Sequence, residues 1–363
     1  MRAVVLSAPG QVGLCEVATP EPRAGEVLLR VMASTMCGTD QKIFAGQFPG
    51  KRFPHIPGHE FAGEVVEVGS ARPGGAPPGS SMTFEASREP SREASHATES
   101  VKSGDRVGVE IHIGCGSCPR CLEGLYQLCL NYGRVDTGHG HIGFTVNGGL
   151  AEYAVVPIKA VHKLPENLTW DEGAFTDNIG IALYAVERGH LQAGERVAVV
   201  GGGAFGGLAA QVARALGAAH VVLIGTRRER LTRLQGMADV LTDDVSSVAP
   251  VDVVVEFAGT AEAARQAIRL ARRGGRVVLA GASGPGLELS GVDLSTFVRG
   301  HLDIYGSLAN PRGISQRGLQ LMARGAVDVK PLITHHFALD DFELAWQTFV
   351  QRRDGAIRVM LHP

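Results

Sequence analysis

The sequence predicts an α/β protein with two domains: a barrel-like, β-rich domain and a domain built on a doubly wound parallel sheet. Three observations lead there. The chain has 363 residues, which is long for a single compact core. Its first third contains short, branched, apolar runs separated by Gly and Pro, as in a barrel-like domain. From about Ile179 onward, such runs alternate with helical stretches, which is typical of a parallel sheet.

The β-rich domain is expected over residues 1–178. Its clearest strands are expected at Met1–Leu6, Gly25–Met32 and Glu60–Val68. The segment Ser70–Ser100 differs from them, because it is rich in Pro, Gly, Ser, Ala, Glu and Arg and has almost no large apolar residue. We therefore expect an exposed, mobile insertion there, either a plain surface loop or a lid or contact arm.

The parallel-sheet domain is expected over residues 179–305, inserted into the other domain. The expected strands are Val197–Val200, Val221–Ile224, Val251–Glu256 and Val277–Ala280, and the expected helices are Leu208–Leu216, Arg228–Gln235 and Ala261–Arg272. After Tyr305 the alternation ends. Residues 306–363, with a helix expected at Ser315–Arg324, are then expected to return to the first domain.

Composition and charge exclude several functional classes. The chain is 44% hydrophobic and 20% charged, which allows a sizeable core. Its formal net charge is −2 and it has no block of five like charges, so we expect no nucleic-acid partner. It also lacks a secretory signal pattern and a run of 18 apolar residues, so no membrane association is expected and the cytoplasm is the default compartment.

Four of the six cysteines lie close together in the sequence. Cys115, Cys118, Cys121 and Cys129 have the spacing C-x2-C-x2-C-x7-C. Without a secretory signal, such a cluster indicates metal ligands rather than disulfides. An iron–sulfur cluster of the ferredoxin type would require a shorter last gap followed by proline. Four thiolates instead suit a closed, structural zinc site.

Three other segments contain possible metal ligands, namely Cys37-Gly-Thr39-Asp40, Gly58-His59-Glu60 and Phe175-Thr-Asp177-Asn178. Alone, each is weak. A lone cysteine is usually a small buried hydrophobic residue, and a lone histidine usually has an ordinary structural role.

The order of the motifs is much more specific. The Cys37 and His59 segments, Gly104-Asp-Arg-Val107, the four cysteines and Gly149-Leu-Ala-Glu-Tyr153 together resemble the zinc-containing medium-chain dehydrogenases. The resemblance covers nearly the whole chain except Ser70–Ser100. It is closest to the threonine and polyol (sorbitol-type) dehydrogenases, through His112, Asp177 and Leu332-Ile-Thr-His335.

This resemblance implies a GroES-like catalytic domain, a Rossmann coenzyme domain and a homodimer or homotetramer. It implies a catalytic zinc held by Cys37 and His59, with Glu60 and Asp177 as the remaining oxygen ligands. The metal would act as a Lewis acid on an alcohol, whose hydride passes to a nicotinamide cofactor. Thr39 corresponds to the family's proton-relay hydroxyl, although a backbone-bonded turn residue is the alternative. Asp40 is expected to hold His59 rather than to act as a base.

One position departs from the family pattern. Many relatives carry a histidine five residues after the cysteine ligand, at the outer end of the proton relay, and here that residue is Lys42. Lysine is a poor proton shuttle unless buried. His55 and His112 are possible substitutes, and His112 is equally expected to shape the substrate site or to be a plain loop residue.

A glycine-rich segment predicts dinucleotide binding. The expected strand Val197–Val200 leads into Gly201-Gly-Gly203-Ala204-Phe205-Gly206 and then a helix, giving G-x-G-x-x-G in its usual setting. Glycines let the backbone approach a pyrophosphate, which is stabilised by the helix N-terminus.

The next strand end indicates which dinucleotide is used. NAD-binding relatives place an acidic residue about 20 residues beyond the glycines. Here the segment is Gly225-Thr226-Arg227-Arg228. Loss of the carboxylate removes repulsion with a 2′-phosphate, and guanidinium groups match phosphate oxygens. This predicts NADP, with NAD use possible if the arginines only form a solvated helix start.

The sequence therefore predicts a zinc-dependent oxidoreductase that transfers a hydride between NADP and a small secondary alcohol: a polyol, sugar alcohol or hydroxy-acid derivative. Within the family, the alternative is an NAD-dependent L-threonine 3-dehydrogenase. Outside that reaction, the alternatives are a zinc-free quinone-type reductase and a non-enzymatic binding protein on the same fold. The proposed metal ligands argue against both.

Overall fold

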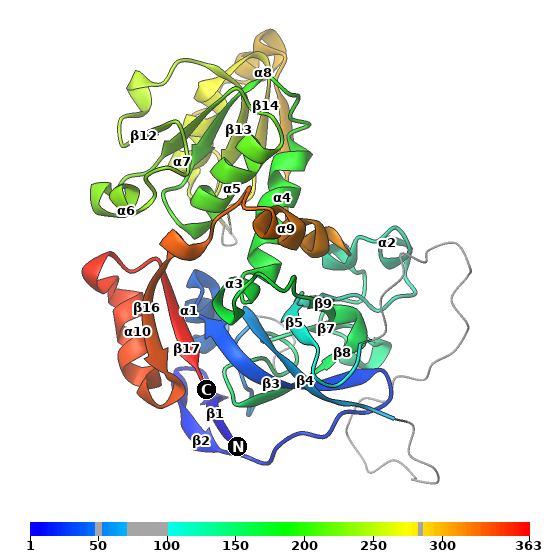
Figure 1. Ribbon diagram of the computed structural model, residues 1–363. Coiled ribbons are helices and arrows are strands. Elements are labelled where there is room, and N and C mark those ends of the chain that lie inside the picture. The colour runs from blue at the N-terminus through cyan, green and yellow to red at the C-terminus, as the bar shows by residue number, and fades with distance from the viewer. Residues whose placement is uncertain (48–52, 71–100, 282–285) are drawn as a thin grey trace. The chain divides into compact units, whose positions relative to one another are not determined.

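A computed structural model describes residues 1–47, 53–70, 101–281 and 286–363 (Figure 1). The described chain divides into two compact units. The first unit comprises Met1–Thr176, His336–Trp346 and Met360–Pro363, and the second comprises Asp177–His335 and Gln347–Val359. Most of the expected insertion at Ser70–Ser100 lies outside the described residues.

The first unit is built on a mainly antiparallel sheet. Its strand order is β16-β17-β3-β4-β5-β9, with β8 pairing beside β3. The strands are β3 (Glu26–Thr35), β4 (Phe61–Val68), β5 (Arg106–Val109), β8 (Tyr153–Pro157), β9 (Val161–Lys163), β16 (Ile333–Ala338) and β17 (Arg358–His362). A separate hairpin joins β1 (Arg2–Ala8) to β2 (Gln11–Glu16). Apolar side chains of β3 and β4 are fully buried, among them Val27, Leu29 and Phe61, and belong to the core of this unit.

A small lobe interrupts this unit between β5 and β8. It contains the two-stranded sheet β6 (His112–Ile113) and β7 (Gly140–His141), with α2 (Pro119–Leu122) and the 3₁₀ turns Tyr126–Leu128 and Val135–Thr137. One of its buried clusters consists of the four cysteine side chains and Tyr126. Ile113, Ile142 and Phe144 are also buried in the lobe.

The second unit contains a six-stranded parallel sheet with the order β12-β11-β10-β13-β14-β15. The strands are β10 (Arg196–Val200), β11 (His220–Ile224), β12 (Val240–Thr242), β13 (Val251–Glu256), β14 (Ala271–Leu279) and β15 (Asp303–Gly306). Numbered from β10, this is the order 3-2-1-4-5-6 of the Rossmann fold, whose ligands bind at the carboxyl ends of the strands where the order reverses. The predicted fold class is confirmed.

Helices cover both faces of this sheet. Successive side chains of a strand point to opposite faces. Ala198 and Val222 pack with Ala267 of α7, whereas Leu223 approaches Gly206 of α5. The first unit has helices as well, and the described chain as a whole contains, besides α2, the helices α1 (Gly38–Phe44), α3 (Trp170–Gly173), α4 (Thr176–Arg188), α5 (Ala204–Ala215), α6 (Arg228–Arg233), α7 (Ala261–Leu270), α8 (Leu294–Gly300), α9 (Ile314–Ala323) and α10 (Phe342–Gln351).

The expected elements differ from the observed ones mainly at their ends. Helix α5 begins at Ala204, inside the glycine-rich segment, because Gly203 is its extended N-cap residue. Strands β12 and β15 were not expected, since both are short and β15 is largely exposed. Within the described ranges, no helix combines the length and hydropathy that a bilayer crossing demands.

Candidate metal centres and cofactor loop

The small lobe brings the sulfurs of Cys115, Cys118, Cys121 and Cys129 within 4.8 Å of one another. The Cys115–Cys121 and Cys118–Cys129 sulfur pairs are 3.9 and 4.0 Å apart. These distances are about twice a disulfide bond length, and all four residues are free cysteines. They suit sulfurs on the edges of one coordination tetrahedron.

Electrostatics in the lobe favour a cation. Burial and the neighbouring thiols raise the pKa of Cys121. Burial also opposes ionisation of Cys115, but hydrogen bonds from the Ser117 backbone and the Asn131 amide lower its pKa to about 5. Close sulfurs cannot all carry a negative charge unless a positive ion offsets their repulsion. Zn²⁺ supplies that charge and prefers this ligand set, so the donor set fits zinc.

A second group of possible ligands is made by Cys37, His59 and Glu60, whose ligand atoms also lie within 4.8 Å of one another. Cys37 follows the end of β3, while His59 and Glu60 precede β4. The two strands pair antiparallel, and the Thr35 amide donates to the Glu60 carbonyl over 2.9 Å. Sheet pairing therefore brings together residues that are distant in the sequence. All three are buried, with exposed fractions of 6% or less.

Gly58 permits this arrangement by a close backbone contact. It has a φ of +95°, and a Cβ atom there would lie 2.5 Å from the Leu150 amide nitrogen. The Gly149 amide donates to the Gly58 carbonyl over 2.9 Å. The Gly149-Leu150 motif thus supports the loop that carries His59. This contact explains why both motifs are needed, although 90 residues separate them in the chain.

Asp40 holds both halves of the group. Its Oδ2 accepts from the Cys37 amide at 2.8 Å, and its Oδ1 lies 3.3 Å from Nδ1 of His59. This leaves Nε2 of His59 on the Glu60 side, 3.9 Å from Oε1. Burial alone would lower the pKa of His59, but the Asp40 carboxylate and the Cys37 sulfur raise it well above the usual value. The surroundings therefore favour positive charge, as a cation site requires.

The other expected members of this site have different settings. Thr39 Oγ1 lies 3.7 Å from the Cys37 sulfur, within reach of an oxygen bound nearby. His55 uses Nε2 in a 2.9 Å hydrogen bond with the Gly143 carbonyl, which makes it a weaker candidate for the relay. Lys42 is partly exposed in α1. Asp177 is buried in the first turn of α4, in the second unit, so its role as a ligand stays a prediction.

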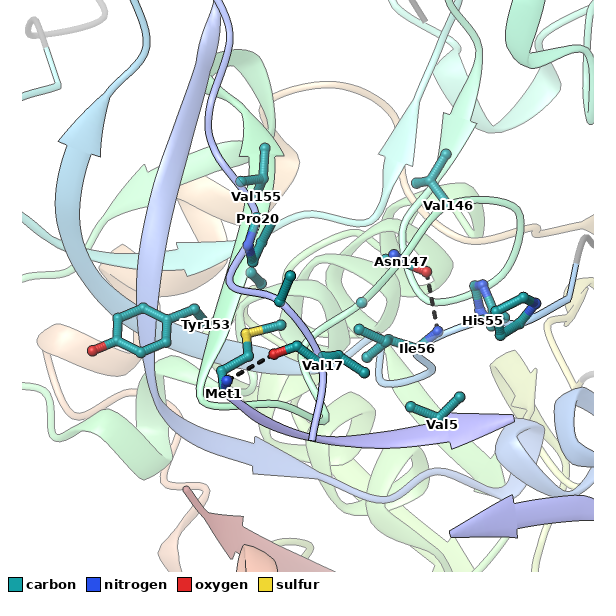
Figure 2. Close-up of a pocket in the computed structure, with 14 residues that line it drawn as sticks. Met1, Val5, Val17, Pro20, His55, Ile56, Val146, Asn147, Tyr153 and Val155 are labelled. Atoms are coloured by element: carbon teal, nitrogen blue, oxygen red, sulfur yellow. Dashed lines mark hydrogen bonds between the residues drawn. The ribbon is translucent and has the colours of Figure 1, made fainter. Parts of the chain in front are cut away.

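A pocket of about 360 Å³ lies elsewhere in the first unit (Figure 2). Its lining is mostly apolar and includes Met1, Val17, Ile56 and Tyr153. None of the metal ligands proposed above lines it. The pocket is therefore not identified as the candidate active site. The positions of the metal-donor groups identify that site instead.

In the second unit, the glycine-rich segment forms the turn between β10 and α5. Gly201 has a φ of +134°, and a Cβ atom at Gly206 would lie 1.8 Å from the Gly201 carbonyl oxygen. A Cβ at Gly225 would lie 2.8 Å from Cα of Gly202. Gly225 is thus required by close packing against the turn, as well as lacking the carboxylate that NAD-binding relatives carry.

Arginines gather beside this turn, but not all of those expected. Arg228 pairs with Asp243 through two contacts of 2.6 and 3.3 Å and is highly exposed. Arg230 was missed by the sequence analysis. Its Nη2 is 3.7 Å from where a Cβ of Gly203 would lie, and its buried Nε has no hydrogen-bond partner among the described residues.

The charge around Arg230 is positive. Burial and the nearby Arg352, Arg227 and Arg358 lower the pKa of Arg230 to about 10. Burial and Arg227 also lower the pKa of Arg352. Guanidinium groups that repel one another form a natural anion site. Arg352 and Arg358 had no local sequence signal, because they lie more than 120 residues beyond the expected strand end.

Comparison with known proteins agrees with this geometry. Residues 23–166 match the alcohol dehydrogenase GroES-like domain model, and residues 204–324 match the zinc-binding dehydrogenase model. The L-threonine 3-dehydrogenase of Pyrococcus furiosus is 31% identical, over 96% of this chain and 94% of that protein. The sorbitol dehydrogenase of Bacillus subtilis is 27% identical, over 100% of this chain and 97% of that protein.

A solved structure from Sinorhizobium meliloti, described as a zinc-binding dehydrogenase bound to NADP, has a TM-score of 0.83 to this chain. It is 30% identical and covers 100% of this chain and 99% of its own.

Proposed function

Because the chain belongs to the zinc-containing alcohol dehydrogenase family, whose relatives include threonine and sorbitol dehydrogenases, we propose that it oxidises or forms a small secondary alcohol with NADP as the hydride carrier. The observation that carries the proposal is the pair of buried donor groups. One is a closed set of four sulfurs, and the other is the mixed set Cys37, His59 and Glu60. A closed set suits a structural metal, and a mixed set leaves a position for substrate.

In this proposal, Cys37, His59 and Glu60 would hold the catalytic zinc, and Asp177 remains a candidate fourth ligand that would exchange with water or substrate. When bound, zinc would supply Lewis-acid polarisation of the substrate hydroxyl. Thr39 would accept the substrate's hydroxyl proton at Oγ1 while releasing its own hydroxyl proton outward, so that the side chain stays neutral. Asp40 fixes the His59 ring and the Cys37 backbone, so that both donors point at the same place.

The NADP assignment is supported by the arginines beside the glycine turn. Arg227, Arg230 and Arg352 repel one another, whereas Arg228 already has a carboxylate partner. A 2′-phosphate would relieve that repulsion. We therefore place the phosphate against Arg227 and Arg230 rather than against Arg228.

The deciding experiment measures kcat/KM for NADP and NAD with one shared substrate and zinc-loaded enzyme. Arg230→Ala should lower the value for NADP by about tenfold or more, since a charge-assisted hydrogen bond contributes roughly 1.5–3 kcal/mol. The value for NAD should change little. Arg228→Ala is the matched control and should leave both values nearly unchanged. A wild type that prefers NAD by about tenfold would contradict the assignment.

A preference of the wild type for NAD would favour the second candidate function, an NAD-dependent L-threonine 3-dehydrogenase. The observation in its favour is the 31% identity to the Pyrococcus furiosus enzyme over most of both chains. A panel of threonine, polyols and sugar alcohols, each tested with both cofactors, separates the two candidates.

We also propose that the chain forms a homo-oligomer through the β15 edge of the second unit. Large apolar side chains are exposed on α8 and just after β15, with 77% of Leu294, 81% of Val298 and 59% of Leu308 accessible. Strand β15 is the last strand of its sheet, so its outer edge can pair with a second copy. Light scattering should find a dimer or tetramer, and Val298→Asp should shift the protein toward the monomer.

A further inference from the structure

Three buried histidines gather around the two-stranded sheet of the lobe: His112 in β6, His141 in β7, and His139 directly before β7. We call them the histidine wall. The His112 and His141 rings stack with centroids 4.0 Å apart, and His141 stacks on Phe144 at 3.6 Å. Phe144 in turn contacts the ring of His59 at 4.8 Å. The wall is therefore joined to a proposed zinc ligand through one intervening ring.

The proton position on His139 follows from its backbone partner. The Gly133 amide donates to Nδ1 of His139 over 3.2 Å. A backbone amide can only donate, so Nδ1 carries no proton. Burial lowers the pKa of His139 to about 4, which keeps the ring neutral near pH 7. A neutral ring with a bare Nδ1 carries its hydrogen on Nε2.

His141 reaches the same state through a tyrosine. Its Nδ1 lies 2.6 Å from the hydroxyl oxygen of Tyr132. We assign the phenol as the donor, because a hydroxyl that keeps its proton can donate it to a ring nitrogen that carries none. Burial raises the pKa of Tyr132 to about 12, so the phenol keeps the proton that it donates. Burial also holds the pKa of His141 well below its usual value. His141 is thus neutral, with its hydrogen on Nε2.

Both Nε2–H groups are buried and lack an acceptor among the described residues. His139 is 0% exposed and His141 is 5% exposed. Buried donors in native proteins nearly always have partners, so these two donors require an acceptor from outside the described chain. His141 is the member of the wall whose ring is joined to His59 through Phe144.

We propose that the histidine wall donates hydrogen bonds to a second oxygen of the substrate, and thereby selects secondary alcohols that carry a further hydroxyl or carboxylate. The inference rests on the proposed dehydrogenase function and deepens it. Neutral N–H donors need an acceptor, so neither an alkyl chain nor an ammonium group satisfies them. A site built to hydrogen-bond a substrate rejects analogues that lack the matching group, because its own buried polar groups are then left unpaired.

The test compares three four-carbon secondary alcohols: 2-butanol, 2,3-butanediol and 3-hydroxybutanoate. The zinc-loaded enzyme should prefer at least one of the two oxygen-bearing compounds over 2-butanol by about a hundredfold or more in kcat/KM. The diol and the hydroxy acid separate a hydroxyl from a carboxylate as the recognised group.

His141→Phe keeps the stacked ring and removes the donor. It should lower kcat/KM for the preferred compound by about tenfold or more and leave 2-butanol unchanged or faster. His141→Gln keeps an N–H donor and should restore part of the preference. His220→Phe, at a half-exposed position of β11 in the other unit, is the control and should change neither value.

Two results would overturn the inference. One is a wild type that turns over 2-butanol as well as the oxygen-bearing compounds. The other is a His141→Phe enzyme in which all substrates slow in parallel, which would indicate a purely structural role. If no secondary alcohol is turned over, the proposed function itself fails. Calorimetry would then compare 3-hydroxybutanoate binding to wild type and His141→Phe, and equal affinities would overturn the inference as well.

Discussion

The two buried donor groups of the first unit differ in how the chain supports them. The four sulfurs of the lobe come from residues 115–129 and are held largely by local backbone hydrogen bonds. Cys37, His59 and Glu60 come from the ends of two paired strands and depend on Asp40. A local, closed set can organise the segment that carries it. A set placed on a rigid sheet can instead leave a coordination position for chemistry, because the sheet does not need the metal to fold.

The largest expected effect is on turnover. His59→Ala removes one of three donors from the mixed set and should lower kcat by about 10⁴-fold or more, since Lewis-acid activation contributes several kcal/mol. Metal analysis should find about one zinc lost per chain, with the lobe zinc retained. NADP binding, measured by fluorescence titration, should be nearly unchanged. Normal turnover by His59→Ala would contradict the assignment of the mixed set as the catalytic metal site and of the four sulfurs as the structural one.

The next effect should be on stability. Cys118→Ser breaks the closed sulfur set and should destabilise the protein by about 3 kcal/mol, which corresponds to a midpoint lowered by roughly 6–12 °C in a domain of this size. Calorimetry and metal analysis would measure both consequences. The matched control is Cys15→Ser, at an exposed cysteine of β2. If Cys118→Ser lost both metals and kept its midpoint, the lobe would not have the separate structural role proposed here.

A smaller effect, on zinc affinity, is expected when Asp40, which positions Cys37 and His59, is changed. Asp40→Asn keeps the size of the side chain but removes the charge beside His59. Zinc affinity at the catalytic group should fall by about 10–100-fold, as for other residues that orient metal ligands. Competition with a chelating dye would show one weakened zinc and one unchanged. Equal weakening of both zincs would contradict the independence of the two groups.

A third group, Asp171, His336 and His362, tests whether proximity alone defines a metal centre. It is more exposed, and its shortest contact is a 2.8 Å hydrogen bond between His362 Nε2 and Asp171 Oδ1. That hydrogen bond raises the pKa of His362, although burial opposes the shift. We therefore expect a histidine–carboxylate ion pair here rather than a metal centre. Because the pair is partly exposed to solvent, it should contribute little to stability.

This ion pair gives the smallest predicted effect. A raised histidine pKa contributes stability below the unfolded value of about 6.5, and the contribution disappears as the pH rises through the folded value. Asp171→Asn should thus destabilise the protein at about pH 6 by no more than about 1 kcal/mol, after screening by solvent. Well above the folded pKa it should have little effect. Urea unfolding at the two pH values measures the difference, and equal losses at both would exclude the ion pair as the cause.

Sequence was sufficient where a feature is local. The parallel sheet follows from runs such as Val251–Glu256, the sulfur set from its spacing, and the glycine turn from its setting between a strand and a helix. The resemblance to a family joined Cys37 to His59, which spacing alone could not do. The contact of Asp40 with His59, expected from that resemblance, is present.

Features made by tertiary packing could not be predicted. Arg352 and Arg358 join Arg230 only because the chain returns to the second unit near its end. His139 and His141 were overlooked because a buried histidine has no periodic pattern, and its importance depends on which nitrogen has a partner. Gly225 was interpreted as a missing acid, but its packing against Gly202 also leaves no room for a side chain. A Gly225→Asp substitution would therefore disturb the turn as well as the cofactor preference.

The division of the chain has a consequence for protein engineering. Residues 347–359 belong to the second unit, although the segments on either side of them belong to the first. The coenzyme-binding unit is consequently not one contiguous stretch. A fragment cut after residue 335 would lose Arg352 and Arg358, and a chimera that exchanged only that stretch would combine the turn of one parent with the arginines of the other. On the proposed placement of the 2′-phosphate, transplanting cofactor preference between relatives would require two crossovers near the C-terminus in addition to those that flank the sheet.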